Sequence, residues 1–283
     1  MNKDLKENLD GYKNGEIDRR EFIKKSTVMA GGAAIAFSFL PEFSASAQII
    51  PSDDARLVTE MITYKGETGD VMAYMARLKG DTKRPAVIVI HENRGLQPHI
   101  KDVTRRMALE GFLALAPDAL SPFGGTSAVP EEAGPLFAKI DYEATKKDFI
   151  AAVEYLKTNP MSTGKVGCTG FSWGGAMTNQ VAVNAPDLVA AVPYYGAQPV
   201  AEDVPKIKAD LLLQYAGNDE RINAGIAAYE EALKKAGVEY KVFMYEGAGH
   251  GFNNDTGGER YNKAAADLAW QRTIAFLKEK LGS

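Results

Sequence analysis

Gly170-Phe171-Ser172-Trp173-Gly174-Gly175 follows the apolar run Lys165 to Thr169 and precedes a segment, Ala176 to Ala185, that we predict to be helical. A strand, a tight turn with serine at its apex and a helix together form a nucleophile elbow, in which strained backbone geometry exposes the serine hydroxyl. Small flanking residues let the strand and the helix approach closely. The stretch therefore predicts a hydrolase with Ser172 as its nucleophile.

Composition excludes several other classes of protein. The chain has 283 residues, 45% of them apolar and 25% charged, with a net charge of −4. These values are ordinary for a globular protein and give no basic patch for nucleic acid, so we expect no nucleic-acid partner. Cys168 is the only cysteine, so no intrachain disulfide can form. Its place within a strand predicts a buried, structural thiol.

The N-terminus carries an export pattern. Asp18-Arg19-Arg20-Glu21-Phe22-Ile23-Lys24 precedes an apolar run, Ser26 to Leu40, and the small-residue site Ala45-Ser46-Ala47. This pattern predicts that residues 1–47 form a twin-arginine (Tat) signal cleaved after Ala47, which implies the Tat machinery as a transit partner and a periplasmic or secreted protein. The apolar run is shorter than the roughly 20 residues of a membrane span, so we expect no permanent span. A retained anchor and an ordinary charged helix are the alternatives.

The rest of the chain alternates between strand and helix patterns. We expect a linker over residues 48–56 and one domain over residues 57–283. The first two strands flank a turn-rich segment and form an antiparallel pair, whereas the later apolar runs suit buried parallel strands. The predicted strands are 57–64, 71–78, 86–90, 112–116, 166–169, 188–193, 211–215 and 240–245, and the predicted helices are 99–110, 143–158, 173–185, 222–236 and 259–281. This alternation predicts an α/β fold, with a mostly parallel sheet between two layers of helices.

One long irregular stretch, Asp118 to Tyr142, is rich in Pro, Gly and Ser. It follows the C-terminal end of a strand, where active-site loops lie in such folds. It either lines a substrate cleft or is an ordinary surface loop.

Ser172 needs a base and a group that orients the base, and for this elbow they follow as an acid and then a histidine. Asp219 ends an apolar strand at a turn and is the preferred acid, with the adjacent Glu220 as the alternative. His250 lies between glycines after the last strand and is the only histidine that follows the elbow. The sequence therefore predicts a Ser172-His250-Asp219 triad.

Attack by the serine creates an oxyanion that needs preorganised donors. The backbone N–H of Trp173, directly after the nucleophile, is the first candidate. The second comes from the loop after strand 86–90, where Asn93 is preferred over Glu92.

Six motifs in this order are similar to those of the dienelactone hydrolase family, across residues 57–281. They are His91-Glu92-Asn93-Arg94-Gly95, Ala116-Pro117-Asp118, the elbow, Gly217-Asn218-Asp219-Glu220, Ala248-Gly249-His250-Gly251-Phe252 and Ala269-Trp270-Gln271-Arg272-Thr273. The resemblance implies an α/β-hydrolase fold without a large lid domain, no metal or cofactor, and a small ester or lactone as substrate. It places Ser172, Asp219 and His250 in the triad, and Glu92 where the family has a glutamate that contacts the nucleophile.

The chain also departs from that pattern. The family's usual nucleophile is cysteine, so Glu92 has a different task beside Ser172: to shape the pocket, to take part directly, or to be a structural carboxylate. Two family arginines that bind the substrate's carboxylate are missing, because Ser121-Pro122 and Asn254 occupy their places. A carboxymethylenebutenolidase-type reaction is implied by the family, but a dienelactone carboxylate is not the substrate we expect. Arg94 either replaces the missing charge or is solvated or ion-paired.

The remaining candidates are supporting residues. Phe123, Tyr195 and Phe252 are predicted to line an apolar pocket, and Tyr194 to pack in the core. His91 is predicted to pack structurally and His99 to lie at the surface. The main hypothesis is a serine hydrolase of esters or lactones that works through an acyl-enzyme. The alternatives are a thioesterase or peptidase on the same fold, and a binding protein without catalysis.

Overall fold

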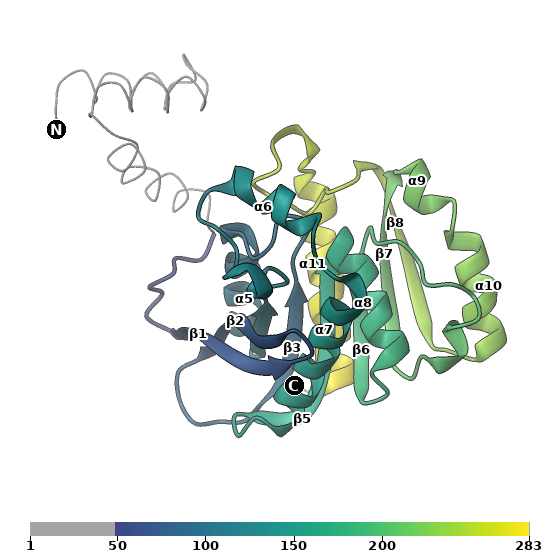
Figure 1. Cartoon of the computed structure of the whole chain (residues 1–283). Coiled ribbons are helices and arrows are strands. Elements are labelled where there is room, and N and C mark those ends of the chain that lie inside the picture. The colour runs from purple at the N-terminus through teal and green to yellow at the C-terminus, as the bar shows by residue number, and fades with distance from the viewer. Residues whose placement is uncertain (1–48, 283) are drawn as a thin grey trace, which may run out of the picture. The chain divides into compact units, whose positions relative to one another are not determined.

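An eight-stranded sheet forms the centre of the fold, in the order β1-β2-β4-β3-β5-β6-β7-β8 (Figure 1). The computed structural model describes residues 49–282, and the chain from Ile50 onwards forms one unit. The pairs β1–β2 and β2–β4 are antiparallel, and all other neighbours are parallel. The strands are β1 (Leu57–Gly66), β2 (Gly69–Leu78), β3 (Arg84–Ile90), β4 (Leu113–Pro117), β5 (Ser162–Phe171), β6 (Leu188–Tyr194), β7 (Asp210–Asn218) and β8 (Tyr240–Gly249).

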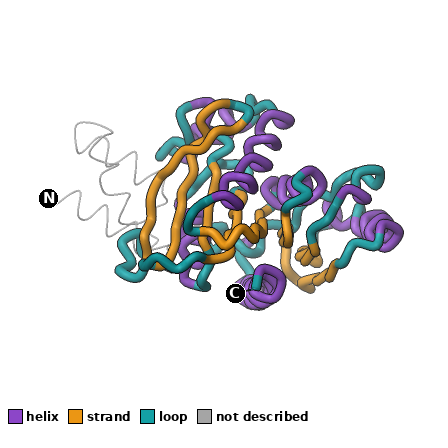
Figure 2. Tube along the Cα trace, turned by 90° about the horizontal axis from the view of Figure 1, so that it is seen from below, coloured by secondary structure: helices purple, strands orange, loops and turns teal. Residues whose placement is uncertain are grey.

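Helices cover both faces of this sheet, as the view in Figure 2 shows. The α-helices are α5 (Pro98–Leu109), α6 (Pro130–Phe137), α7 (Tyr142–Thr158), α8 (Trp173–Asn184), α9 (Glu220–Asn223), α10 (Ile226–Ala236) and α11 (Lys263–Leu281). Helices α7, α8 and α10 pack into one apolar cluster, and α5 and α11 pack into another on the opposite face. The central strands β3 and β4 are buried almost throughout, because apolar side chains on both faces of a strand need cover on both sides. The predicted α/β class, with a mostly parallel sheet between two layers of helices, is therefore confirmed.

The helices of the described chain differ from the expected ones in three places, one of which is the last helix, which begins at Lys263 rather than at residue 259. The expected helix 222–236 is split into α9 and α10, with Ala224 and Gly225 between them. Helix α6 lies inside the stretch predicted to be irregular, since Pro130 at its first position suits a helix start while Pro135 within it weakens the pattern. Short 3-10 turns η1 (Ser121–Phe123), η2 (Val204–Lys206) and η3 (Gly258–Arg260) complete the fold.

The predicted export signal and its cleavage site lie outside the described residues. Between residues 49 and 282, no helix combines the length and the apolar character that a membrane crossing requires.

Candidate active site

Ser172 lies at the sharp turn between β5 and α8. Its backbone angles are φ 56° and ψ −111°, a conformation that L-residues other than glycine rarely adopt. The Ser172 N–H donates to the carbonyl oxygen of Tyr194 on β6 at 3.0 Å, which ties the turn to the neighbouring strand. Such local strain persists only where the surrounding structure holds it, and it is concentrated at functional sites. The turn has the geometry predicted for a nucleophile elbow.

A chain of two hydrogen bonds links Ser172 to an acid. Its Oγ lies 2.7 Å from Nε2 of His250, and Nδ1 of His250 lies 2.5 Å from Oδ2 of Asp219. The imidazole is 30% exposed, whereas the Asp219 side chain is only 6% exposed. The buried carboxylate accepts a hydrogen bond from Nδ1–H, which keeps the proton on Nδ1. Nε2 is therefore unprotonated and can accept the serine proton. Asp219 rather than the exposed Glu220 makes this contact.

Asp219 is itself fixed by the start of a short helix. Its Oδ1 accepts a hydrogen bond from the Ile222 N–H at 3.4 Å, as the N-cap of α9. One carboxylate oxygen therefore holds the helix and the other holds His250. This division keeps the imidazole in one orientation.

The ring of Tyr195, a residue predicted to lie in the pocket, packs against His250 with centroids 5.1 Å apart. Tyr195 is fully buried and has a positive φ of 38°, which is uncommon for a bulky residue. Burial raises the pKa of its phenol well above 10, so the phenol stays neutral. Phe252 packs behind it at 5.2 Å and is also fully buried. The sequence predicts that Phe252 lines an apolar pocket, but its ring instead supports Tyr195 from within the core.

The two predicted oxyanion donors come from the start of a helix and from a loop. Trp173 is the first residue of α8, where backbone N–H groups lack a partner within the helix and the helix dipole favours negative charge. Asn93 lies in the loop between β3 and α5. Within residues 49–282, neither amide N–H donates a hydrogen bond, so both are available to an anion.

Glu92 is joined to the loop that follows His250. Its Oε2 accepts a hydrogen bond from Nδ2 of Asn254 at 2.7 Å. Arg94 and Phe123 are exposed, and no ion pair of Arg94 occurs in the part of the chain that the structure describes. The structure thus connects Glu92 to the neighbourhood of the triad, whereas Arg94 and Phe123 make no polar contact with it.

His91 is buried beneath the site, as expected. The Ala119 N–H donates to its Nε2 at 3.1 Å, so the proton is on Nδ1, which donates to the Glu92 carbonyl oxygen at 2.6 Å. Its ring also stacks on that of Trp173, with centroids 5.6 Å apart. His99, by contrast, is only 5% exposed, so the prediction that it lies at the surface is wrong.

We expect His91 to make the fold sensitive to acid. Burial lowers the pKa of His91 below its usual value, so its contribution to stability is complete above about pH 6.5 and is lost as the pH falls from there towards the folded pKa. The unfolding free energy of the wild type should therefore fall more steeply between pH 7.5 and 5 than that of His91→Gln. Urea titrations at several pH values measure this difference, and parallel curves would contradict it.

Cys168 should be chemically inert in the folded protein. Burial raises the pKa of its thiol to about 12, although Thr178 within hydrogen-bond reach at 3.7 Å acts in the opposite direction. Thiolates, not thiols, react with disulfide reagents. We expect no reaction with Ellman's reagent at pH 8 in buffer, and one thiol per chain in guanidinium chloride. Rapid reaction of the native protein would show that the strand opens.

No group of three or more His, Cys, Asp or Glu side chains between residues 49 and 282 is arranged to hold a metal ion.

Comparison with known proteins shows which family this chain is related to. The model of the dienelactone hydrolase family matches residues 71–281. The chain belongs to the dienelactone hydrolase family. A relative from Escherichia coli K12, named "Putative carboxymethylenebutenolidase", is 31% identical over 247 residues, which cover 82% of this chain and 90% of the relative.

Two further proteins match this chain over a similar length. "Protein usf" of Aquifex pyrophilus is 35% identical over 235 residues, covering 78% of this chain and 99% of its own. The crystal structure of a "Putative Dienelactone Hydrolase" from Klebsiella pneumoniae superposes with a TM-score of 0.70 at 27% identity, covering 79% of this chain and 99% of that one. The dienelactone hydrolase resemblance that the six motifs indicated is thus confirmed over most of the chain.

Proposed function

We propose that this dienelactone hydrolase family member is a serine hydrolase that cleaves carboxylic esters or lactones through an acyl-enzyme. The observation that carries the proposal is the unbroken hydrogen-bond path from Ser172 Oγ through His250 to Asp219. In the first step Ser172 attacks the substrate carbonyl while His250 Nε2 takes the hydroxyl proton. Asp219 stabilises the imidazolium that forms.

The developing oxyanion is held by the N–H groups of Trp173 and Asn93, and the helix dipole of α8 adds to the field there. Collapse of the tetrahedral intermediate expels the alcohol, which receives the proton from His250. A water molecule, deprotonated by the same imidazole, then cleaves the acyl-enzyme and regenerates Ser172.

For the substrate we propose a small ester or lactone without a free carboxylate group. The name of the Escherichia coli relative refers to a carboxymethylenebutenolidase, an activity that resemblance alone extends to this chain. At the position where the family places a carboxylate-binding arginine, Asn254 is bonded to Glu92, and neither side chain supplies positive charge. Specificity belongs to the individual site rather than to the fold.

A fluorophosphonate probe tests the proposed function. The probe should label the folded protein, peptide mapping should place the label on Ser172, and hydrolysis of p-nitrophenyl acetate should stop as labelling proceeds. A panel of esters, lactones, thioesters and peptide amides then identifies the bond that is cleaved. Failure to label Ser172 in folded protein would favour a binding protein, and faster turnover of thioesters or amides would replace the ester assignment.

We further propose export through the Tat route, since residues 1–47 carry the pattern described above. N-terminal sequencing of the exported protein should begin at Gln48. A sequence that begins at Met1 would instead indicate a retained anchor.

A further inference from the structure

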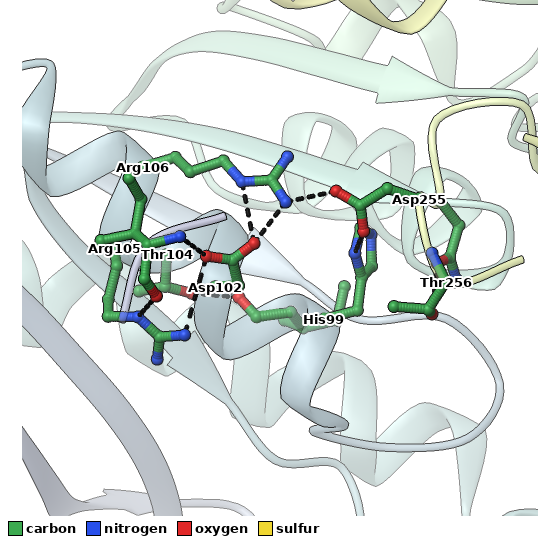
Figure 3. A network of polar contacts seen from close by, with 10 residues as sticks. His99, Asp102, Thr104, Arg105, Arg106, Asp255 and Thr256 are labelled. Atoms are coloured by element: carbon green, nitrogen blue, oxygen red, sulfur yellow. Dashed lines mark hydrogen bonds and ion pairs between the residues drawn. The ribbon is translucent and has the colours of Figure 1, made fainter. Parts of the chain in front are cut away.

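Asp255 lies five residues after His250 and connects its loop to a distant helix. Its Oδ1 lies 2.8 Å from Nδ1 of His99, and its Oδ2 contacts the guanidinium of Arg106. Both partners belong to α5, and Figure 3 shows their side chains meeting the two oxygens of one carboxylate. These three residues are called the Asp255 bridge below.

Asp102 holds the Arg106 end of the Asp255 bridge in place. Arg106 Nε donates to Oδ2 of Asp102 at 3.0 Å, and Oδ1 of Asp102 accepts the Ile50 N–H at 2.8 Å. Burial alone raises the pKa of Asp255, but the hydrogen bonds and charges of His99 and Arg106 bring it below its usual value, so Asp255 is ionised at neutral pH. Removing one member of such a shielded group of charges leaves the charges of the remaining members unpaired in a buried position.

The bridge joins two segments that both reach the candidate active site. Helix α5 begins at Pro98, directly after the loop with Asn93, and His99 lies in its first turn. On the other side, the loop after His250 is closed on itself, because the Phe252 N–H donates to Gly249 at 3.2 Å and the Asn262 N–H donates to Phe252 at 3.0 Å. Asp255 lies between Phe252 and Asn262, the two residues joined by the second of these bonds, and is five residues from His250.

We propose that Asp255 is a positioning residue, which through His99 and Arg106 sets the place of the His250 imidazole relative to Ser172 and the Asn93 amide. The inference rests on the proposed function but concerns a residue that touches none of the reacting atoms. A misplacement of reacting groups by about 1 Å can cost on the order of 100-fold in rate. Loss of the bridge should thus affect turnover more than substrate binding.

The test compares Asp255→Ala with a matched control on the same helix. Glu110 at the end of α5 pairs with Lys278 of α11 at 2.8 Å, so Glu110→Gln removes an ion pair of α5 without touching the loop. Asp255→Ala should lower kcat for p-nitrophenyl acetate roughly ten- to hundredfold, with KM changed less than about threefold. Asp255→Asn, which keeps one acceptor oxygen, should lose less. Glu110→Gln should retain the wild-type kcat.

Two further measurements distinguish a change in the position of the His250 imidazole from a general loss of stability. The double variant Asp255→Ala, His99→Gln should be no slower than Asp255→Ala, because the ion-pair partner of His99 within the described residues is Asp255 and both changes remove the same contact. The proton between His250 and Asp219 should give a downfield NMR resonance that is broadened or shifted in Asp255→Ala and unchanged in Glu110→Gln.

The resonance reports the imidazole position whether or not the protein hydrolyses esters. If it changes in Asp255→Ala while the wild type neither labels nor hydrolyses, the inference on positioning stands and the proposed function fails. If hydrolysis depends on Ser172 but Asp255→Ala keeps the wild-type kcat and resonance, the inference is overturned. Equal losses in Asp255→Ala and Glu110→Gln would also overturn it.

Discussion

Ser172→Ala should lower kcat for ester hydrolysis by a factor on the order of 10⁶, and His250→Ala by a similar factor, whereas Asp219→Ala should cost on the order of 10⁴. Without the hydroxyl no acyl-enzyme forms, and without the imidazole the proton has no acceptor at 2.7 Å. Without Asp219 the imidazole loses its buried partner at 2.5 Å and with it the preferred tautomer. Steady-state kinetics with p-nitrophenyl acetate measure each loss.

The double variant Ser172→Ala, His250→Ala is the control for this prediction. Residues that act as one unit are not additive, so the double variant should be no slower than Ser172→Ala alone. Circular dichroism confirms that each variant is folded. Substantial activity in folded Ser172→Ala would mean that the nucleophile is another group, and the buried thiol of Cys168 does not offer one.

The hydrogen-bonded arrangement of the proposed triad could be predicted because each member is marked locally and by chain order. Ser172 follows a strand and lies between glycines, Asp219 ends the strand β7, and His250 follows β8. Parallel strands bring their carboxyl ends to one edge of the sheet, so residues far apart in the chain meet there without any further information. The structure adds the distances, and it resolves the choice between Asp219 and Glu220.

The supporting residues could not be predicted in the same way, because their roles depend on tertiary contacts. His99 opens a helix and looks like a surface residue, but its partner Asp255 is 156 positions away in the chain. Tyr195 is marked by a positive φ, which a one-dimensional pattern does not reveal. The sequence predicts Phe252 in an apolar pocket, whereas the chain turns at Gly251, with φ 84°, and the Phe252 ring is buried in the core.

Gly174→Ala should strongly destabilise the fold, with a loss of about 3 kcal/mol in unfolding free energy. A Cβ at this position would lie 2.4 Å from the carbonyl oxygen of His91 and 2.5 Å from that of Ile90. Both atoms belong to the backbone of the buried strand β3 and its exit, so no side-chain rotation relieves the clash. Either α8 moves away from the sheet or the start of the Asn93 loop is displaced.

Gly134→Ala is the matched control, since it makes the same chemical change in α6, where no atom lies within 4 Å of the added Cβ. Alanine favours a helix interior over glycine by up to about 1 kcal/mol, so this variant should be as stable as the wild type or more so. Urea unfolding of both variants measures the difference. A Gly174→Ala protein as stable as the wild type would show that α8 does not need its close approach to β3. The folded fraction of Gly174→Ala should also turn over esters more slowly, because the clash displaces the backbone that leads into the second oxyanion donor.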